Sequence, residues 1–333
     1  MNLDAAMAAA IEQAEQVKGR TYPNPPVGAV ILDRDGQIAG VGATAPTGGP
    51  HAEVVALRRA GERAAGGTAV VTLEPCNHVG RTPPCVDALL AAGVAEVAFA
   101  VADPNPVAAG GAARLAEAGV RVTAGVLADA VAGGTLREWL HKQRTGVPHV
   151  TWKFAASVDG RSAAADGTSQ WITSEAARAD VHRRRAAADA IVVGTGTVLA
   201  DDPTLTARLP DGSPADHQPL RVVVGVREIS PEARVLNDDS RTMVIRTRDP
   251  HEVLRALADR TDVLLEGGPT LAGAFLRAGL VDRILAYVAP VLLGGPITAV
   301  DDVGVSNITG AHRWRFDTVA RLGPDVLLGL TPP

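Results

Sequence analysis

Apolar residues over the first 146 positions alternate between helical and strand-like spacing. Met7, Ile11, Ala14 and Val17 recur at helical intervals after Asp4, which we expect to cap that helix. Apolar, β-branched runs bounded by turns predict buried strands. The expected strands are 27–32, 37–43, 68–73, 97–101 and 120–126, and the further helices are 52–60, 86–92, 112–118 and 136–143. Strands separated by helices imply a sheet covered on both faces.

The same alternation restarts after a short Gly/Pro segment at residues 145–148. Ser174 is expected to cap a helix over 175–188, and a helix opens at Pro269 and stops at Gly279. A further helix is expected at 251–259. The strands of this half are expected at 149–156, 190–193, 221–226, 243–246, 263–265, 284–293 and 325–330. We therefore predict an α/β protein with two domains, 1–146 and 147–333.

Composition narrows the class of protein. A chain of 333 residues with 46% apolar and 21% charged residues is typical of a globular protein with two cores. The net charge of −5 gives no basic field that would attract nucleic acid. Neither a membrane-spanning apolar run nor a secretory signal is recognisable. With two cysteines in the chain, we expect a cytoplasmic protein without a disulfide.

The strongest chemical signal is His51-Ala52-Glu53 followed by Cys76 and Cys85, each preceded by proline. One imidazole and two thiolates supply three zinc ligands and leave a fourth position for water, as in catalytic sites. Zinc lowers the pKa of such water to about 7. Glu53 can then shuttle protons without ligating the metal. Zinc nucleobase deaminases combine His-x-Glu with Pro-Cys-x-x-Cys, whereas eight residues separate the cysteines here. Cys85 can lie at a helix N-terminus, which favours its thiolate.

Other interpretations of these residues stay open. Two cysteines and a histidine can be ordinary buried residues. A purely structural zinc site would need a fourth protein ligand, and His78 could serve. The chain could then be a non-catalytic binding protein. It could also be a nucleoside or nucleic-acid deaminase with an unrelated C-terminal domain, although its acidity counts against polynucleotide binding.

Motifs throughout the chain resemble one family. They are TYPNPPVG at 21–28, HAE at 51–53, EPCNH at 74–78, GRTPPC at 80–85, SVDG at 157–160, SQWI at 169–172, LADDP at 199–203 and EGGPTL at 266–271. This set is similar to the bifunctional deaminase–reductases of riboflavin biosynthesis. The resemblance implies a cytidine-deaminase-like three-layer αβα domain and a dihydrofolate-reductase-like α/β domain.

The resemblance also implies two consecutive reactions on a small pyrimidine ribosylamine phosphate. The first is zinc-dependent hydrolytic removal of a ring amino group. The second is NADPH-dependent reduction of the ribosyl group to ribityl. The family is usually a homo-oligomer, and we favour a dimer. Two positions depart from its pattern: Thr44 stands where a substrate-holding histidine is common, and Asn77 stands where a serine is common.

Candidate binding residues follow from local chemistry and from the resemblance together. Expected contacts of the deaminase substrate are Asn24, Arg81, Asp103 and Asn105. Expected contacts of the reductase substrate are Lys153, Ser169, Arg185, Leu205, Arg208 and Glu266. Expected contacts of NADPH are Ala155, Trp171, Thr197, Asp201, Gly268, Pro269, Thr270, Leu271, Ala272, Gly273 and Ala274. Gly267-Gly268 and the helix from Pro269 are expected to form a phosphate site, because bare backbone N–H groups meet a helix N-terminus there.

The arginine-rich run 182–185 resembles a nucleic-acid patch only superficially. Successive helix residues rotate by about 100°, so these side chains cannot share one surface. By resemblance Arg185 binds substrate phosphate, and we expect the others to be solvated.

Overall fold

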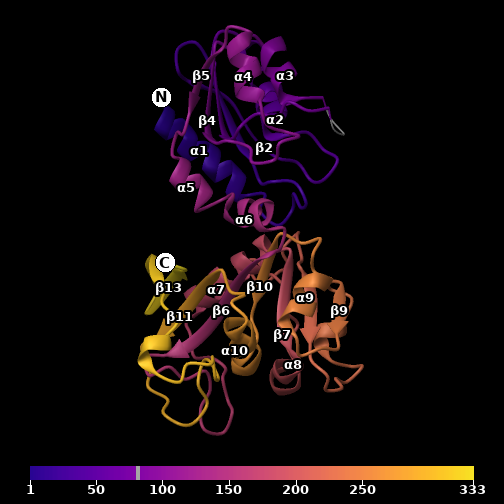
Figure 1. Ribbon diagram of the computed structural model, residues 1–333, viewed down its shortest axis with the longest axis vertical. Helices are drawn as coiled ribbons and strands as arrows, with labels where there is room; N and C mark the ends of the chain where they lie inside the picture. The colour runs from indigo at the N-terminus through magenta and orange to yellow at the C-terminus, as the bar shows by residue number, and fades with distance from the viewer. Residues whose placement is uncertain (80–82) are drawn as a thin grey trace. The chain divides into compact units, whose positions relative to one another are not determined.

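Two separate β-sheets organise the chain, in a computed structural model that describes residues 1–79 and 83–333. Contacts divide the chain into two units, Met1–Gly146 and Val147–Pro333. Each unit holds one of the sheets, with helices packed against it (Figure 1). The predicted α/β class is therefore confirmed for both halves.

The first unit contains a five-stranded sheet of order β2-β1-β3-β4-β5. Its strands are β1 (Gly28–Leu32), β2 (Ile38–Ala43), β3 (Thr68–Leu73), β4 (Glu96–Val101) and β5 (Arg121–Ala124). Its helices are α1 (Leu3–Glu15), α2 (Ala52–Ala60), α3 (Cys85–Ala91), α4 (Gly111–Glu117), α5 (Ala128–Ala132) and α6 (Arg137–Thr145), with a 3₁₀ turn at Gly61–Ala64. Strand β1 is antiparallel to both neighbours, whereas β3, β4 and β5 are parallel.

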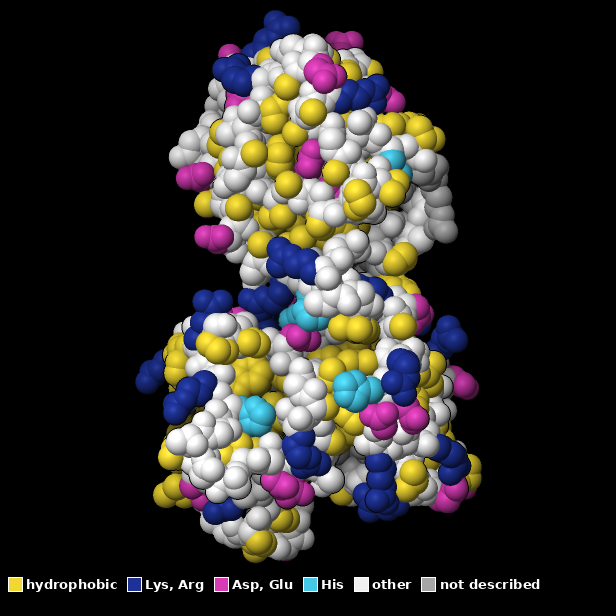
Figure 2. Space-filling view, in the orientation of Figure 1, with side chains coloured by type: hydrophobic (Ala, Val, Ile, Leu, Met, Phe, Trp, Pro, Cys, Tyr) yellow, Lys and Arg dark blue, Asp and Glu magenta, His cyan; other side chains and the backbone are white. Residues whose placement is uncertain are grey.

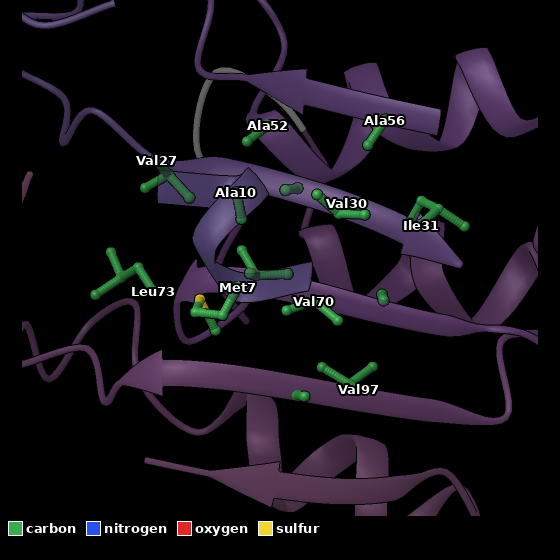
Figure 3. Packing of buried hydrophobic residues seen from close by; sticks show 14 of the residues in the cluster. Met7, Ala10, Val27, Val30, Ile31, Ala52, Ala56, Val70, Leu73 and Val97 are labelled. Atoms are coloured by element: carbon green, nitrogen blue, oxygen red, sulfur yellow. The ribbon is translucent and has the colours of Figure 1, made fainter. Parts of the chain in front are cut away.

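Glycines in β1 and β2 let two helices approach opposite faces of this sheet. A Cβ atom on Gly28 would lie 1.8 Å from the Ala10 carbonyl oxygen of α1, and one on Gly42 would lie 2.4 Å from the Ala52 carbonyl oxygen of α2. Gly42 pairs with Ala29, the neighbour of Gly28, so the two glycines face opposite sides. Figure 3 shows Met7 and Ala10 of α1 and the alanines of α2 packed against the strands. The result is a three-layer αβα unit.

The second unit contains an eight-stranded sheet of order β12-β13-β11-β6-β10-β7-β8-β9. Its strands are β6 (His149–Ser157), β7 (Ala190–Gly194), β8 (Leu220–Val224), β9 (Thr242–Ile245), β10 (Asp262–Leu265), β11 (Arg283–Ala289), β12 (Arg315–Leu322) and β13 (Asp325–Thr331). Its helices are α7 (Glu175–Ala187), α8 (Thr195–Asp201), α9 (Pro250–Ala256) and α10 (Pro269–Arg277), with 3₁₀ turns at Arg234–Leu236 and Ile308–Gly310. The six strands from β11 to β9 are parallel, and β12 and β13 are antiparallel.

Alternate residues of β7 pack into different cores, so both faces of this sheet are covered. Val192 belongs to the core that includes Phe275 of α10. Ile191 belongs to the core that includes Val198 of α8. The carboxyl ends of β7 and β10 therefore lead into α8 and α10, next to each other in the sheet.

Several details differ from the expected elements. Asn2, not Asp4, caps α1, because its side chain accepts the Ala5 N–H at 2.8 Å while Asp4 lies in the first turn. Helices α5 and α8 form where no element was expected. Strand β12 was not expected, because most of its residues are exposed and the apolar alternation is weak.

Within the described part of the chain, no helix has the length and apolar character of a membrane span. On the face shown in Figure 2, basic side chains are interspersed with acidic and apolar ones on each unit.

Candidate functional site

Helix α2 delivers His51 and Glu53 together. His51 is the residue before the helix and has extended backbone angles, while Glu53 lies in the first turn. The close approach of Ala52 to Gly42 fixes this end of the helix against β2. The expected helix over 52–60 is confirmed, and His51 and Glu53 lie at its start.

The two cysteines come from two other elements of the first unit. Cys76 follows the end of β3, and Cys85 is the first residue of α3. The Cys85 backbone N–H points to the Cys76 Sγ at 3.4 Å. Cys85 therefore lies at a helix N-terminus, as expected.

These three side chains form a group that could hold a metal ion. The His51 Nδ1 lies 3.2 Å from the Cys85 Sγ and 3.5 Å from the Cys76 Sγ, and all three donor atoms lie within 4.8 Å of one another. His78 is not a member of this group, although it is among the described residues. One imidazole and two sulfurs are a donor set that zinc prefers.

The pKa shifts of the two cysteines also favour a bound metal ion. Hydrogen bonds from Cys85 and then from His51 lower the pKa of the Cys76 thiol to about 4, against the effect of burial. The neighbouring Cys76 sulfur and burial raise the pKa of Cys85. The pair therefore carries one negative charge readily and resists a second. A divalent cation would remove that resistance, because metal ligation requires both thiolates.

Glu53 is 4% exposed beside this group. Burial raises the pKa of its carboxyl, and the Cys76 sulfur adds to that effect. A buried carboxyl next to a metal-ligand set can hold or release one proton within the cavity.

A cavity of about 400 Å³ opens over the group. Its walls include Asn24, Thr44, His51, Glu53, Glu74, Cys76, His78, Asp103, Asn105, Trp139 and Gln143. The cavity thus brings together the three described deaminase contacts that we expected. The fourth, Arg81, lies outside the described residues. Thr44 is buried and bonds to Val27 through its hydroxyl, which accepts the Val27 N–H at 3.1 Å.

The wall also contains residues that were not expected as substrate contacts, among them Trp139, Gln143 and His78. Trp139 and Gln143 come from α6, which the sequence predicts as a helix without indicating which face meets the cavity. His78 was considered only as a metal ligand, and its buried Nδ1 has no hydrogen-bond partner in the described structure. The EPCNH motif was the signal that could have pointed to it.

The second unit holds a different cluster, centred on Glu266 at the end of β10. Arg185 of α7 binds Glu266 through two hydrogen bonds, from Nε at 2.7 Å and from Nη2 at 2.8 Å. Lys153 of β6 lies 3.7 Å from the same carboxylate. Burial opposes the charge on Glu266, but Arg185 and then Lys153 outweigh it and lower its pKa to about 2. The cluster is complete without a ligand and keeps one net positive charge.

The segment beside this cluster carries the other expected substrate contacts. Arg185 also donates from Nη1 to the Thr206 carbonyl at 3.2 Å. Leu205 is buried with a φ of 54°, and Arg208 is exposed. Ser169 is not part of this segment: it precedes α7 in the chain, and its hydroxyl donates to the Asp201 carboxylate at 3.4 Å.

The expected cofactor contacts lie near the carboxyl ends of β7 and β10. Gly268 precedes α10 and has extended backbone angles, and a Cβ atom there would lie 3.4 Å from the Thr197 Oγ1. The glycine turn and Thr197 are thus neighbours. Trp171 is 69% exposed under the Arg178 guanidinium, 4.7 Å from the ring centroid. Ala155 is half-buried on β6, and Ala272 and Gly273 face the core.

The three arginines in the run 182–185 pair with two different carboxylates. Arg183 and Arg184 both pair with Asp180 at 2.8 Å, and Arg185 pairs with Glu266. Arg184 also donates to the Tyr287 hydroxyl. The expectation that Arg184 is a solvated side chain was therefore wrong.

Comparison with family models separates the chain at the same place. Residues 1–101 match the cytidine and deoxycytidylate deaminase zinc-binding region. Residues 148–328 match the RibD C-terminal domain. This second match removes the alternative of an unrelated C-terminal domain.

Full-length relatives and solved structures agree with these matches. The riboflavin biosynthesis protein RibD of Mycobacterium tuberculosis is 73% identical over 99% of this chain and 97% of its own length. RibD of Escherichia coli K12 is 42% identical over 97% and 98%. Acinetobacter baumannii RibD superposes with a TM-score of 0.88 at 39% identity, covering 99% of both chains. A Thermotoga maritima diaminohydroxyphosphoribosylaminopyrimidine deaminase/5-amino-6-(5-phosphoribosylamino)uracil reductase superposes with a TM-score of 0.90 at 32% identity, again over 99% of both.

Proposed function

The chain belongs to the RibD family of riboflavin biosynthesis, and on that premise we propose how its residues divide two reactions. It is a bifunctional deaminase and reductase that acts on a small pyrimidine. We assign deamination to residues 1–146 and reduction to residues 147–333. The observation that carries the assignment is the meeting of a three-donor metal group and Glu53 in one cavity.

In the first unit, His51, Cys76 and Cys85 would hold Zn²⁺, which when bound supplies a water nucleophile at neutral pH. Glu53 takes a proton from the attacking water and delivers it to the departing ring amine. Asn24, Asp103 and Asn105 hold the ring and ribose through hydrogen bonds from the cavity wall. Arg81 binds the substrate phosphate, by resemblance to the family.

In the second unit, NADPH is the proposed form of the reduced nucleotide and supplies the hydride. Gly268 and the N-terminus of α10 face its phosphates, because the first backbone N–H groups of a helix attract anions. Trp171, Thr197 and Asp201 complete the cofactor contacts by resemblance.

The substrate of the reductase meets a preformed cationic cluster. Arg185, Arg208 and Lys153 bind its phosphate, while Ser169 and Glu266 hold its hydroxyls or ring edges and Leu205 is a further contact. The support is the surplus positive charge around Glu266, which favours an anionic substrate.

We further propose that the chain works as a cytoplasmic homo-oligomer, with a dimer favoured. The resemblance to the family supports the oligomer, and two buried free cysteines suit a reducing compartment. Light scattering of the purified protein measures the oligomer directly, and a monomer at micromolar concentration would contradict it.

The decisive experiment supplies the diaminopyrimidine ribosylamine phosphate with no nucleotide, with NADPH or with NADH. We expect ammonia and a deaminated ribosyl product without nucleotide, and a ribityl product only when NADPH is added. Ammonia release without NADPH oxidation in any mixture would contradict the reductase assignment. Equal rates with NADH and NADPH would contradict only the choice of nucleotide.

A further inference from the structure

Glu74 is a buried carboxylate that neither the metal group nor the proton transfer uses. It follows β3 and lies two residues before the metal-ligand candidate Cys76. Only 7% of Glu74 is exposed, and the residue contributes to the cavity wall. A buried carboxylate is stable only where hydrogen bonds replace its hydration.

Three backbone N–H groups satisfy this carboxylate. Glu74 Oε2 accepts the Asp103 N–H at 3.1 Å. Glu74 Oε1 accepts the Gly110 N–H at 3.2 Å and the Ala112 N–H at 3.0 Å. One side chain therefore holds both ends of the segment 103–110. Since both oxygens are engaged, Glu74 is a fixed acceptor.

The carboxylate also replaces a missing helix cap. Gly110 is the residue before α4 and has no side chain that could accept the first helix N–H groups. Glu74, the residue after β3, supplies that acceptor, and a negative charge there is favourable at the N-terminus of the helix. A Cβ atom on Gly111 would lie 1.8 Å from the Pro75 carbonyl oxygen, so α4 rests directly on the backbone beside Glu74.

The segment that Glu74 holds carries Asp103 and Asn105 into the cavity. A second contact keeps it in place, because the Asn77 N–H donates to the Ala108 carbonyl at 3.0 Å. Glu74 therefore anchors both ends of the segment to the stretch of chain that carries Cys76. Displacement of the anchor would move Asp103 and Asn105 relative to the metal group.

We propose that Glu74 is a positioning residue for deamination, which sets substrate affinity by fixing the 103–110 segment against the metal-ligand strand. The inference rests on the proposed role of Asn105 as a substrate contact. Small misplacements of binding groups reduce enzyme efficiency strongly, and here the loss should fall on KM.

The test uses the full-length, zinc-loaded protein. Glu74→Gln keeps the shape but replaces one acceptor oxygen with a donor. We expect the KM of deamination to rise about 10- to 100-fold, the range for losing hydrogen bonds to a charged group. The kcat should stay within a few-fold, with one zinc per chain and unchanged reduction of pre-deaminated substrate. Glu117→Gln, on the exposed surface of α4, is the matched control and should behave as wild type.

A double-mutant cycle with Asn105→Ala separates the possible failures. If Glu74 acts through the segment, the rise in KM of the double variant should be clearly smaller than the product of the two single rises, because Asn105 carries part of the effect. Multiplicative effects, a loss of zinc, or an unchanged KM in Glu74→Gln would overturn the inference. A normal KM in Asn105→Ala alone would instead refute the proposed substrate contact. If Glu74→Gln fails to fold, Glu74→Asp retains the charge but is too short for both ends, and it should show an intermediate KM; a wild-type KM would again refute the inference.

Discussion

The two units treat buried charge in opposite ways. In the first, three donor atoms converge and the paired cysteines resist a second negative charge. In the second, Glu266 lies between Arg185 and Lys153, which compensate its charge. Both clusters lie beside the carboxyl ends of strands, yet only in the second do side chains of the protein itself compensate the buried carboxylate.

This difference predicts different effects when a molecule or ion binds to each cluster. The first site needs a cation from solution to complete it, so metal binding and local stability are linked. The second cluster is preorganised, so the substrate that we propose for it would meet charges whose desolvation was offset during folding. We therefore expect loss of the metal to lower both the activity and the stability of the first unit, and loss of Glu266 to lower the stability of the second unit.

Removal of zinc should have the largest effect and should be confined to the first unit. Chelation is expected to abolish deamination and to lower the thermal midpoint of residues 1–146, since the cysteine pair loses its cation. Reduction of pre-deaminated substrate should continue. Calorimetry and metal analysis before and after chelation measure this, and a parallel fall in reductase activity would break the comparison.

Glu53→Gln should leave zinc in place and reduce deamination by about 10²- to 10⁴-fold, the usual size of general acid–base catalysis. The amide fills the same buried space but cannot shuttle the proton. Ammonia release in single-turnover assays measures the loss, with reductase activity as the internal control. Turnover within a few-fold of wild type would rule out the role.

Glu266→Gln should destabilise the second unit by about 3–5 kcal/mol, because it leaves buried cations without their partner. Glu228→Gln is the matched control, since its pair with Arg246 is exposed and should contribute at most about 1 kcal/mol. Urea unfolding of both variants gives the values. Similar losses would show that the Glu266 cluster is not the electrostatic core we describe.

Acid should reveal the same cluster in the wild-type protein. The pKa of Glu266 is about 2, below its ordinary value of 4.5, so its contribution is present above pH 4.5 and is lost as the pH falls toward 2. The shift corresponds to a contribution on the order of 3 kcal/mol. The difference in unfolding free energy between wild type and Glu266→Gln should shrink from pH 5 to pH 3. A constant difference over that range is the contrary result.

The smallest effects should separate substrate from cofactor in the second unit. Arg208→Ala should weaken substrate binding by about 1.5–3 kcal/mol, the range for a hydrogen bond to a charged group, and leave NADPH affinity unchanged. Gly268→Val should do the reverse, because the fold has room for a Cβ atom there but a bound phosphate would not. Titration calorimetry with each ligand measures both. Normal affinities in both variants would place the site elsewhere.

Local pattern was sufficient for much of the fold and for the metal group. Helix α2 and strand β3 have the predicted bounds, because apolar periodicity and a terminal glycine determine them locally. His51, Cys76 and Cys85 could be predicted because few residue types ligate zinc, so identity and order nearly define the set. The layered α/β architecture of both units follows from the alternation of strands and helices, whereas the antiparallel strand β12 was not expected.

Tertiary structure alone decided which charges meet. Arg185 and Glu266 lie 81 positions apart, and nothing in either local pattern distinguishes a partner of the other from a contact of the substrate. Glu74 likewise gains its role only when β3 and the segment before α4 come together. Periodicity reports which face of an element is buried, whereas the partner of a buried charge depends on strand order and register. Those are properties of the folded chain, because they join segments that the sequence keeps far apart.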